Sequence, residues 1–444
     1  MIHQKYDLFS ELNPKQRVSF MLIAACFALW GFTNDMTSTM ASAFSKIFRM
    51  SVMEADLVVV ANHLGYLVMG LPAALFIMKY RFKAGVLVGL AIYAAGALFF
   101  LPAKMLGTFT PFLLAYFTMT CGLAFLETSC HPMVYRMGSE DSGIGRINLA
   151  QSFNALGALI GMFVVRDIIQ AGMSPVSHAD RMTMPLKQFE IIKDHDLGVL
   201  IQPYVYIAAV IALLMVVIRL NKMDTLNEPP KDETLIEQIK TILKNKNYSE
   251  GVITQFFYVG AQVCCWAYII QYGARIFVAE GIAENEAEML AQKYNIAAMA
   301  MFAAFRFIFT YLLKFLAPGR LLSLAAITAG VFTLGVVLFS DRNGLYCLII
   351  VSACMSLMFS TIYGISLRGL GNHVKLASAG MTMAVFGGAV FPAIQAAIME
   401  SHVTLLGLSA VNLSFQVPIF CFVVVALYGH RSYVRHYITK NYYD

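Results

Sequence analysis

Charged side chains are scarce in this sequence. Asp, Glu, Lys and Arg together make up 13% of its 444 residues, whereas hydrophobic residues make up 59%. Soluble domains average about 25% charged residues. This scarcity excludes an ordinary soluble protein and predicts an integral membrane protein. The net charge of +6 gives no reason to expect a nucleic-acid partner for a chain of this class.

The sequence also lacks the motifs of common enzymes and metal sites. It has no Gly-x-Ser-x-Gly, no His-Glu-x-x-His and no Walker-type phosphate loop. Its eight cysteines include no Cys-x-x-Cys pair, and most lie in apolar segments, as expected of small buried hydrophobic residues and not of disulfides or metal ligands. We therefore expect no enzymatic activity, no metal and no cofactor.

Apolar segments of about 20 residues, the length of a membrane-spanning helix, recur along the whole chain. The N-terminal stretch 1–17 is polar, and the first apolar segment is longer than a signal-peptide core, so we expect no cleaved signal. We predict an all-α membrane protein with twelve transmembrane helices. Their approximate ranges are 18–44, 55–78, 84–103, 109–135, 146–169, 199–219, 250–278, 290–314, 321–340, 344–367, 376–399 and 405–429.

Basic residues indicate the orientation and the internal division of these helices. Lys and Arg are more frequent in the segments that would be cytoplasmic if both termini are cytoplasmic. A polar segment containing Pro229-Pro230 separates two groups of six helices, and similar short basic turns follow the second and the eighth helix. We predict an N-terminal six-helix half (1–220), a cytoplasmic linker (221–248) and a C-terminal six-helix half (249–444). The mixed-charge segment 170–198 is predicted to be an outside loop.

Two carboxylates, Asp35 and Glu127, fall within predicted membrane spans. A charged side chain near the bilayer centre costs about 2.5–3.5 kcal/mol on insertion scales, so it normally faces an interior cavity and marks a substrate or proton path. His131 follows Glu127 by four residues and therefore shares its helix face, where the two could exchange a proton. We predict that Asp35, Glu127 and His131 couple proton movement to transport. Structural pairing with polar neighbours is the alternative.

Amide and aromatic side chains recur at helical spacing in three predicted spans. Amides both donate and accept hydrogen bonds, which suits sugar hydroxyls, and an aromatic ring can cover the C–H surface of a sugar. Helix-to-helix packing is the alternative for such polar groups. The predicted substrate-binding residues are Asn34, Ser38, Glu127, Gln151, Asn154, Tyr258, Gln262 and Trp266. Arg306 lies deep within a predicted span, and we expect it to form a gating or structural pair.

Several phrases of this sequence resemble one transporter family over nearly the whole chain. They are Phe27-Ala-Leu-Trp-Gly-Phe-x-Asn34, Leu126-Glu-Thr128 followed by Pro132, Asn148-Leu-Ala-Gln-x-Phe-Asn154, and Gln255-Phe-x-Tyr-Val-Gly-Ala-Gln262 with Trp266. The family is that of the L-fucose:proton symporters within the major facilitator superfamily. It implies two pseudo-symmetric six-helix halves and proton-coupled sugar uptake across a bacterial inner membrane by alternating access.

The resemblance also implies roles for individual residues. Glu127 matches the family's coupling glutamate, Gln151 and Asn154 match amides near the sugar, and Trp266 matches a tryptophan of the seventh helix. The family's first-helix aspartate falls at Ser38, and Asp35 lies one turn earlier on the same face.

We therefore predict proton symport of an L-fucose-like sugar, a hexose or an N-acetylated amino sugar by a monomer in the bilayer. A sodium-coupled symporter, an amphiphile exporter and a non-transporting sugar sensor remain alternatives.

Overall fold

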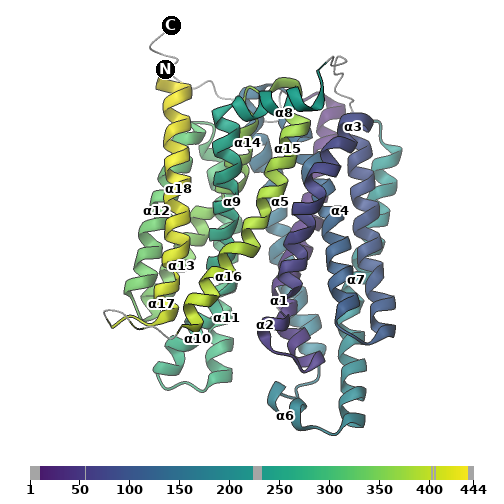
Figure 1. Ribbon diagram of the computed structural model, residues 1–444, viewed down its shortest axis with the longest axis vertical. Coiled ribbons are helices and arrows are strands. Elements are labelled where there is room, and N and C mark those ends of the chain that lie inside the picture. The colour runs from purple at the N-terminus through teal and green to yellow at the C-terminus, as the bar shows by residue number, and fades with distance from the viewer. Residues whose placement is uncertain (1–10, 56, 224–232, 402–403, 405–406, 439–444) are drawn as a thin grey trace.

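The structure is a computed structural model that describes residues 11–438 apart from 56, 224–232, 402–403 and 405–406. The side chains of residues 34–39 and of a few other helical residues also lie outside the described part. Long, nearly parallel helices form one bundle (Figure 1), and no strand occurs among the described residues.

The helices before residue 221 are α1 (Pro14–Phe48), α2 (Val52–Ala55), α3 (Leu57–Leu106), α4 (Thr110–Tyr135), α5 (Glu140–Val164), α6 (His178–Thr183) and α7 (Leu186–Leu220). A short helix, α8 (Leu235–Lys244), follows. The remaining helices are α9 (Lys246–Ala267), α10 (Ile269–Ala279), α11 (Glu284–Leu312), α12 (Pro318–Leu338), α13 (Arg342–Met355), α14 (Met358–Leu367), α15 (Val374–Met383), α16 (Gly387–Glu400), α17 (Ala410–Ser414) and α18 (Gln416–Tyr433).

Eleven helical segments of the described chain are long and apolar enough to cross a membrane. One of them, α3, has 50 residues and would be about 75 Å long at about 1.5 Å per residue, more than twice the thickness of a bilayer core. Arg81 interrupts α3 with φ 73° and ψ 163°, so this segment supplies two crossings. The prediction of an all-α membrane protein with twelve crossings is confirmed.

Several of the last six crossings are divided into two helices. Tyr268 separates α9 from α10, residues 356–357 separate α13 from α14, and a 3₁₀ turn, Ala384–Phe386, separates α15 from α16. Interrupted helices expose backbone groups that can take part in a site within a transporter. Helices that are interrupted within a crossing are therefore more frequent in the last six crossings (α9–α18) than in the first six (α1–α7).

α1 and α5 approach each other at glycines. A Cβ atom on Gly31 would lie 1.9 Å from the carbonyl oxygen of Asn154, and one on Gly157 would lie 1.9 Å from that of Ala28. Only a residue without a side chain permits such backbone contact between membrane helices. The close contact fixes the middle of α1 against the face of α5 that carries Asn154.

The first and last six crossings meet through a defined set of helices. α15 packs against α3 and α4, while α11 and α14 pack against α5. α15 begins at the end of the bundle where α8 lies (Figure 1). At the opposite end, the segment predicted to be a loop over 170–198 contains α6 and the first turns of α7.

That segment is held by a buried ion pair. Arg181 and Asp196 have side chains with no exposed surface and lie 2.7 Å apart. Asp196 also accepts a hydrogen bond from the backbone N–H of Ser174 at 2.8 Å. The ion pair thus fixes the segment at one buried point, although most of its other residues are exposed or half-buried.

Candidate functional site

Glu127 lies in the interior of the bundle on α4. Of the hydrophobic stretch of this helix, 78% is buried inside the protein, so α4 is a central helix and Glu127 does not face lipid. The Glu127 side chain is fully buried, and neither carboxylate oxygen has a hydrogen-bond partner among the described residues. Burying an ionised carboxylate without a donor is costly. Glu127 is therefore placed where gaining or losing a proton has a large energetic effect.

His131 lies one turn further along the same face of α4. Its Nδ1 atom donates to the backbone carbonyl of Glu127 at 3.1 Å, and its Nε2 atom accepts from the Gln151 amide at 2.7 Å. This pair of bonds corresponds to a neutral ring protonated at Nδ1. No hydrogen bond joins the side chains of Glu127 and His131 in the described structure. The direct contact that proton exchange between these two side chains would need is therefore not formed in this conformation.

Aromatic rings enclose the His131 ring. Tyr363 of α14 stacks on it with ring centroids 4.4 Å apart, and Phe27 of α1 meets it edge-on at 4.8 Å. The Tyr363 hydroxyl is buried and has no hydrogen-bond partner among the described residues. Tyr363 was not predicted from the sequence, although Ser356, Ser360 and Ser366 recur around it at helical spacing.

Gln151 of α5 connects His131 to Arg306 of α11. The Nη1 atom of Arg306 donates to the backbone carbonyl of Gln151 at 3.1 Å and to its side-chain oxygen at 3.4 Å. Arg306 is 2% exposed, and no carboxylate lies within 4.0 Å of it in the described structure. The pair expected for Arg306 is therefore made with carbonyl oxygens, and it joins the first six crossings to the last six.

Asn154, one turn beyond Gln151, is half-buried and donates to the backbone carbonyl of Phe27 at 3.2 Å. Asn148, one turn before Gln151, accepts from Ser360 at 2.7 Å and donates to Thr361 at 3.2 Å. Ser360 and Thr361 belong to α14, so Asn148 provides a second polar bridge between the first and last six crossings. The sequence had favoured Gln151 and Asn154 over Asn148 as ligand contacts.

The predicted substrate-binding residues of α9 differ in their solvent exposure. Tyr258 is fully buried, and its hydroxyl donates to the backbone carbonyl of Met355 at 2.9 Å. Gln262 and Trp266 are half-buried. The indole nitrogen of Trp266 donates to Ser352 at 3.0 Å, and its ring packs on the small cluster that includes Ala158 of α5. Trp266 thus adjoins the α5 face that carries Asn154.

Gln255, also on α9, is a fully buried amide. Neither its oxygen nor its nitrogen has a hydrogen-bond partner in the described part of the chain. Its helical spacing to Tyr258 and Gln262 was visible in the sequence, but nothing in that spacing indicates that the amide is left without partners.

The side chains of Asn34, Asp35 and Ser38 lie outside the described part of the structure. Their backbone belongs to α1, beyond Gly31, where α1 contacts α5. The structure thus connects Glu127, through its backbone carbonyl, with His131, Gln151 and Arg306. Asn154 lies on α5, and Trp266 packs beside this helix. The described residues contain no group of three or more His, Cys, Asp or Glu side chains that could hold a metal ion.

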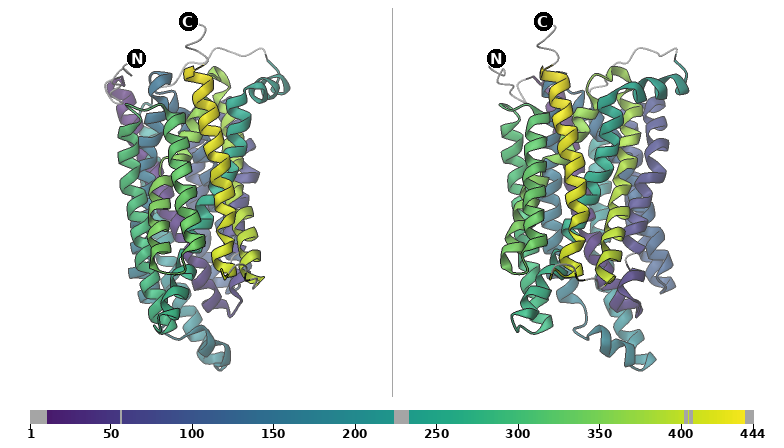
Figure 2. Two further views of the ribbon diagram at one scale, coloured as in Figure 1. Left: turned by 90° about the vertical axis from the view of Figure 1, so that its left-hand side faces the viewer. Right: turned by 60° about the vertical axis from the view of Figure 1, so that its left-hand side comes forward.

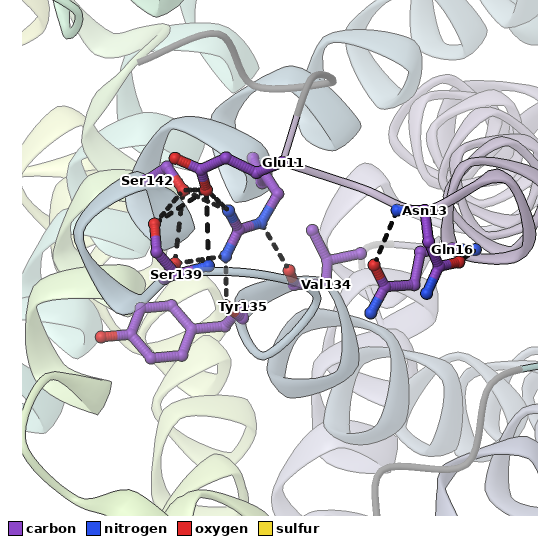
Figure 3. A network of polar contacts seen from close by, with 8 residues as sticks. Glu11, Asn13, Gln16, Val134, Tyr135, Ser139 and Ser142 are labelled. Carbon is purple, nitrogen blue, oxygen red and sulfur yellow. Dashed lines mark hydrogen bonds and ion pairs between the residues drawn. The ribbon is translucent and has the colours of Figure 1, made fainter. Parts of the chain in front are cut away.

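A polar network joins the segment before α1 to the α4–α5 turn at the α8 end of the bundle (Figure 3). Arg146 at the start of α5 donates to the carbonyl oxygens of Tyr135 at 2.9 Å and Ser139 at 2.6 Å, and it lies 3.5 Å from Glu11. Partial burial raises the pKa of Glu11, but hydrogen bonds from Ser142 and Ser139 outweigh burial and hold this pKa below its usual value. The segment that precedes α1 is thereby fastened to the α4–α5 turn.

The same turn contacts the last six crossings. A carboxylate oxygen of Glu140 accepts from the backbone N–H of Gly369 at 2.6 Å and from the Tyr135 hydroxyl at 3.0 Å. Gly369 lies in the turn between α14 and α15. Deeper in the bundle, the Thr128 hydroxyl of α4 donates to Thr382 of α15 at 3.0 Å.

Comparison with known proteins places this arrangement among transporters. Residues 21–394 match the model of the Major Facilitator Superfamily. The L-fucose-proton symporter of Haemophilus influenzae is 40% identical over 95% of this chain and 98% of that protein. A glucose/galactose transporter of Brucella abortus is 24% identical over 95% of this chain and 96% of its own length.

Two crystal structures are also similar. One is a variant of the Escherichia coli fucose:proton symporter, and the other is a superfamily transporter in the outward conformation. Each matches with a TM-score of 0.82 and 28% identity, over 94% of this chain and 99% of the other.

Proposed function

This chain belongs to the Major Facilitator Superfamily, and we propose that it imports a monosaccharide by proton symport through alternating access. It is a secondary active transporter and not an enzyme. The named activities of its relatives, L-fucose-proton symport and glucose/galactose transport, support an L-fucose-like sugar, a hexose or an N-acetylated amino sugar as substrate. We place it in a bacterial inner membrane as a monomer with both termini in the cytoplasm.

The fully buried, unpartnered carboxylate of Glu127 carries this proposal. In the interior of a bundle, its charged form lacks both water and hydrogen-bond donors, so closing the protein around it is costly. Binding a proton removes that cost. Glu127 therefore permits the change of access when it is protonated and opposes it when it is charged, and this is the property that a proton-coupling residue needs.

We propose that the sugar binds between Glu127 of α4, the amide groups of α5 and α9, and the ring of Trp266. Gln151 and Asn154 now use their amides within the protein, and hydroxyl groups can take over such bonds because each hydroxyl both donates and accepts. We propose Asn34, Ser38, Glu127, Gln151, Asn154, Tyr258, Gln262 and Trp266 as the substrate-binding residues. Within this set, the half-buried Asn154, Gln262 and Trp266 are open enough to meet the sugar first.

His131 and Asp35 complete the proposed coupling group. His131 joins the Glu127 backbone to Gln151, so a sugar that binds Gln151 would disturb the ring next to Glu127. Asp35 lies on α1 one turn before Ser38 and supplies a second carboxylate. Proton and sugar binding are thus linked through Gln151 and His131.

Arg306 is proposed to be a gating residue. Its bonds to Gln151 cross from α11 to α5, so a relative movement of the first and last six crossings must lengthen or break them. Together with the Glu140–Gly369 contact, they support a conformation that is closed at the α8 end. On the proposed topology this is the cytoplasmic end, and the protein faces outward.

The test is uptake by the purified protein in proteoliposomes, with a panel of labelled hexoses, deoxyhexoses and amino sugars. An inward proton gradient should drive accumulation of at least one sugar, and Glu127→Gln, which resembles the protonated side chain, should abolish accumulation while preserving exchange of labelled for unlabelled sugar. Thr118→Val on the exposed face of α4 is the matched control. Accumulation driven by sodium at fixed pH would refute proton coupling, and a lack of exchange for every sugar would refute transport.

A further inference from the structure

α8 is a separate surface helix between the first and the last six crossings. Thr234 caps its start, with reciprocal hydrogen bonds to Glu237, and Asn245 both ends α8 and caps α9. Only this one residue separates α8 from a membrane-crossing segment, so α8 lies at the membrane boundary. It runs across the end of the bundle (Figure 1), and turned views show it projecting from the side of the bundle (Figure 2).

One face of α8 is apolar and exposed. Four large side chains on it have exposed fractions of 39%, 65%, 37% and 58%, namely Leu235, Ile236, Ile239 and Leu243. At about 100° per residue they form one stripe along the helix. The side that faces the protein is instead formed by Gln238 and Ile242, which are 5% and 3% exposed. The stripe therefore lies about a quarter-turn around the helix from the side that faces the protein, and it is not part of the core.

Basic side chains border the stripe on the edge away from the protein. Lys240 and Lys244 are both exposed and follow Ile236 and Leu243 around the helix. An apolar stripe flanked by lysines is the pattern of a helix that lies in the surface of a membrane, where the apolar side chains enter the acyl region and the lysines reach the headgroups. The positive charge favours a surface that contains anionic lipid.

Two contacts hold α8 in this orientation. The Nε2 atom of His373, in the turn between α14 and α15, lies 2.8 Å from a Glu233 carboxylate oxygen just before α8. At the other end, the Asn245 amide donates to the carbonyl of Arg368 at 3.5 Å. Because both contacts involve the α14–α15 turn, α8 is fastened to the last six crossings at the point where Gly369 meets Glu140.

We propose that α8 is a membrane-surface anchor that inserts its Leu235, Ile236, Ile239 and Leu243 stripe into the adjacent leaflet and binds anionic headgroups through Lys240 and Lys244. That this is the cytoplasmic leaflet rests on the topology of the proposed function. The partner is the lipid bilayer itself, and its acidic headgroups would hold the α14–α15 turn at a fixed depth.

The experiment uses the full transporter in vesicles of phosphatidylcholine with or without phosphatidylglycerol. The fluorophore NBD is attached to Ile236→Cys on the stripe or to Thr241→Cys on the exposed opposite face. All eight native cysteines are buried, and the wild-type protein measures their background labelling. NBD at 236 should show blue-shifted emission that brominated lipid chains quench several times more strongly than at 241.

The lysines are tested in the same assay. Phosphatidylglycerol should increase the quenching at 236, and Lys240→Gln/Lys244→Gln should remove this increase, since each lysine near an anionic surface shifts the binding equilibrium about fivefold. Lys222→Gln/Lys246→Gln, which leaves α8 unchanged, should retain it. Water-like emission at 236, or blue-shifted emission that brominated lipid does not quench, would overturn the proposal; the second result would mean that protein covers the stripe. Because the fluorescence readout does not require transport, it tests the membrane anchor independently of the sugar and the coupling ion.

Discussion

Removing the Glu140 carboxylate should loosen the closure at the α8 end of the bundle. Its bond to the Gly369 amide joins the α4–α5 turn to the α14–α15 turn at 2.6 Å. A hydrogen bond to a charged group contributes about 1.5–3 kcal/mol, and the exposure of Glu140 reduces this to about 1 kcal/mol. Since about 1.4 kcal/mol is a factor of ten, Glu140→Ala should increase the open fraction at this end about fivefold.

Alkylation of a reporter cysteine measures this fraction. Ser378 of α15 is fully buried, and its hydroxyl donates to the carbonyl of Lys375 in its own helix, so Ser378→Cys is a small change. When opening and closing are faster than the chemical step, the alkylation rate follows the open population. Glu140→Ala in the Ser378→Cys background should therefore react about fivefold faster with a small maleimide.

Asp141→Ala provides the matched control. Asp141 and Glu140 both lie in the first turn of α5, so either substitution removes one favourable charge from the helix N-terminus. Of these two residues, Glu140 alone has a bond to the α14–α15 turn in the described structure. Equal alkylation rates in the two variants would refute the reasoning, because the effect would then come from the helix and not from the contact between the turns.

Three further predictions concern stability and packing. Because hydrogen bonds hold the pKa of Glu11 below its usual value of 4.5, its stabilising contribution is complete above about pH 4.5 and is lost as the pH falls through the lowered pKa. The melting temperature should therefore drop more steeply below pH 4.5 in the wild type than in Glu11→Gln, and parallel curves would contradict this. Asp196→Ala should lower the opening free energy of the α6 segment by about 3–5 kcal/mol, seen as faster hydrogen exchange there, whereas the exposed Asp194→Ala should cost at most about 1 kcal/mol; equal exchange would count against the buried pair. Gly31→Ala should lower thermal stability and uptake together, because its Cβ would overlap the α5 backbone, while Gly330→Ala on α12, with its nearest atom at 3.8 Å, should be tolerated; normal uptake by Gly31→Ala would show that α1 and α5 can separate.

Much of the architecture could be predicted because membrane insertion imposes simple rules. A span needs a continuous apolar segment of about 20 residues, and such segments identify the twelve crossings without any knowledge of packing. The same rules fail outside the bilayer. The segment 170–198 contains enough charge to suggest a solvated loop, yet the burial of Arg181 against Asp196 depends on helix positions that a local pattern does not encode.

The candidate site shows a similar division. The cost of a carboxylate in a membrane predicted that Glu127 faces the interior, and the structure buries it completely. Helical spacing correctly placed His131 on the same face, but it could not show that the ring bonds to a backbone carbonyl and to Gln151. The Arg306–Gln151 contact joins residues 155 positions apart, and no periodicity within one helix reports such a pairing.

The glycine contact between α1 and α5 has a consequence for how this transporter could be re-engineered. Because the two backbones touch at Gly31 and Gly157, α1 and α5 behave as a single mechanical part, and Asp35 travels with Gln151 and Asn154. On the proposed site, exchanging these amides would alter which sugar is bound while leaving the contact of their helix with α1 intact. Substitution of side chains could therefore change sugar selectivity without changing proton coupling, whereas a change that separates the two helices would alter both. New specificities should be sought by substitution on α5, with its glycines left unchanged.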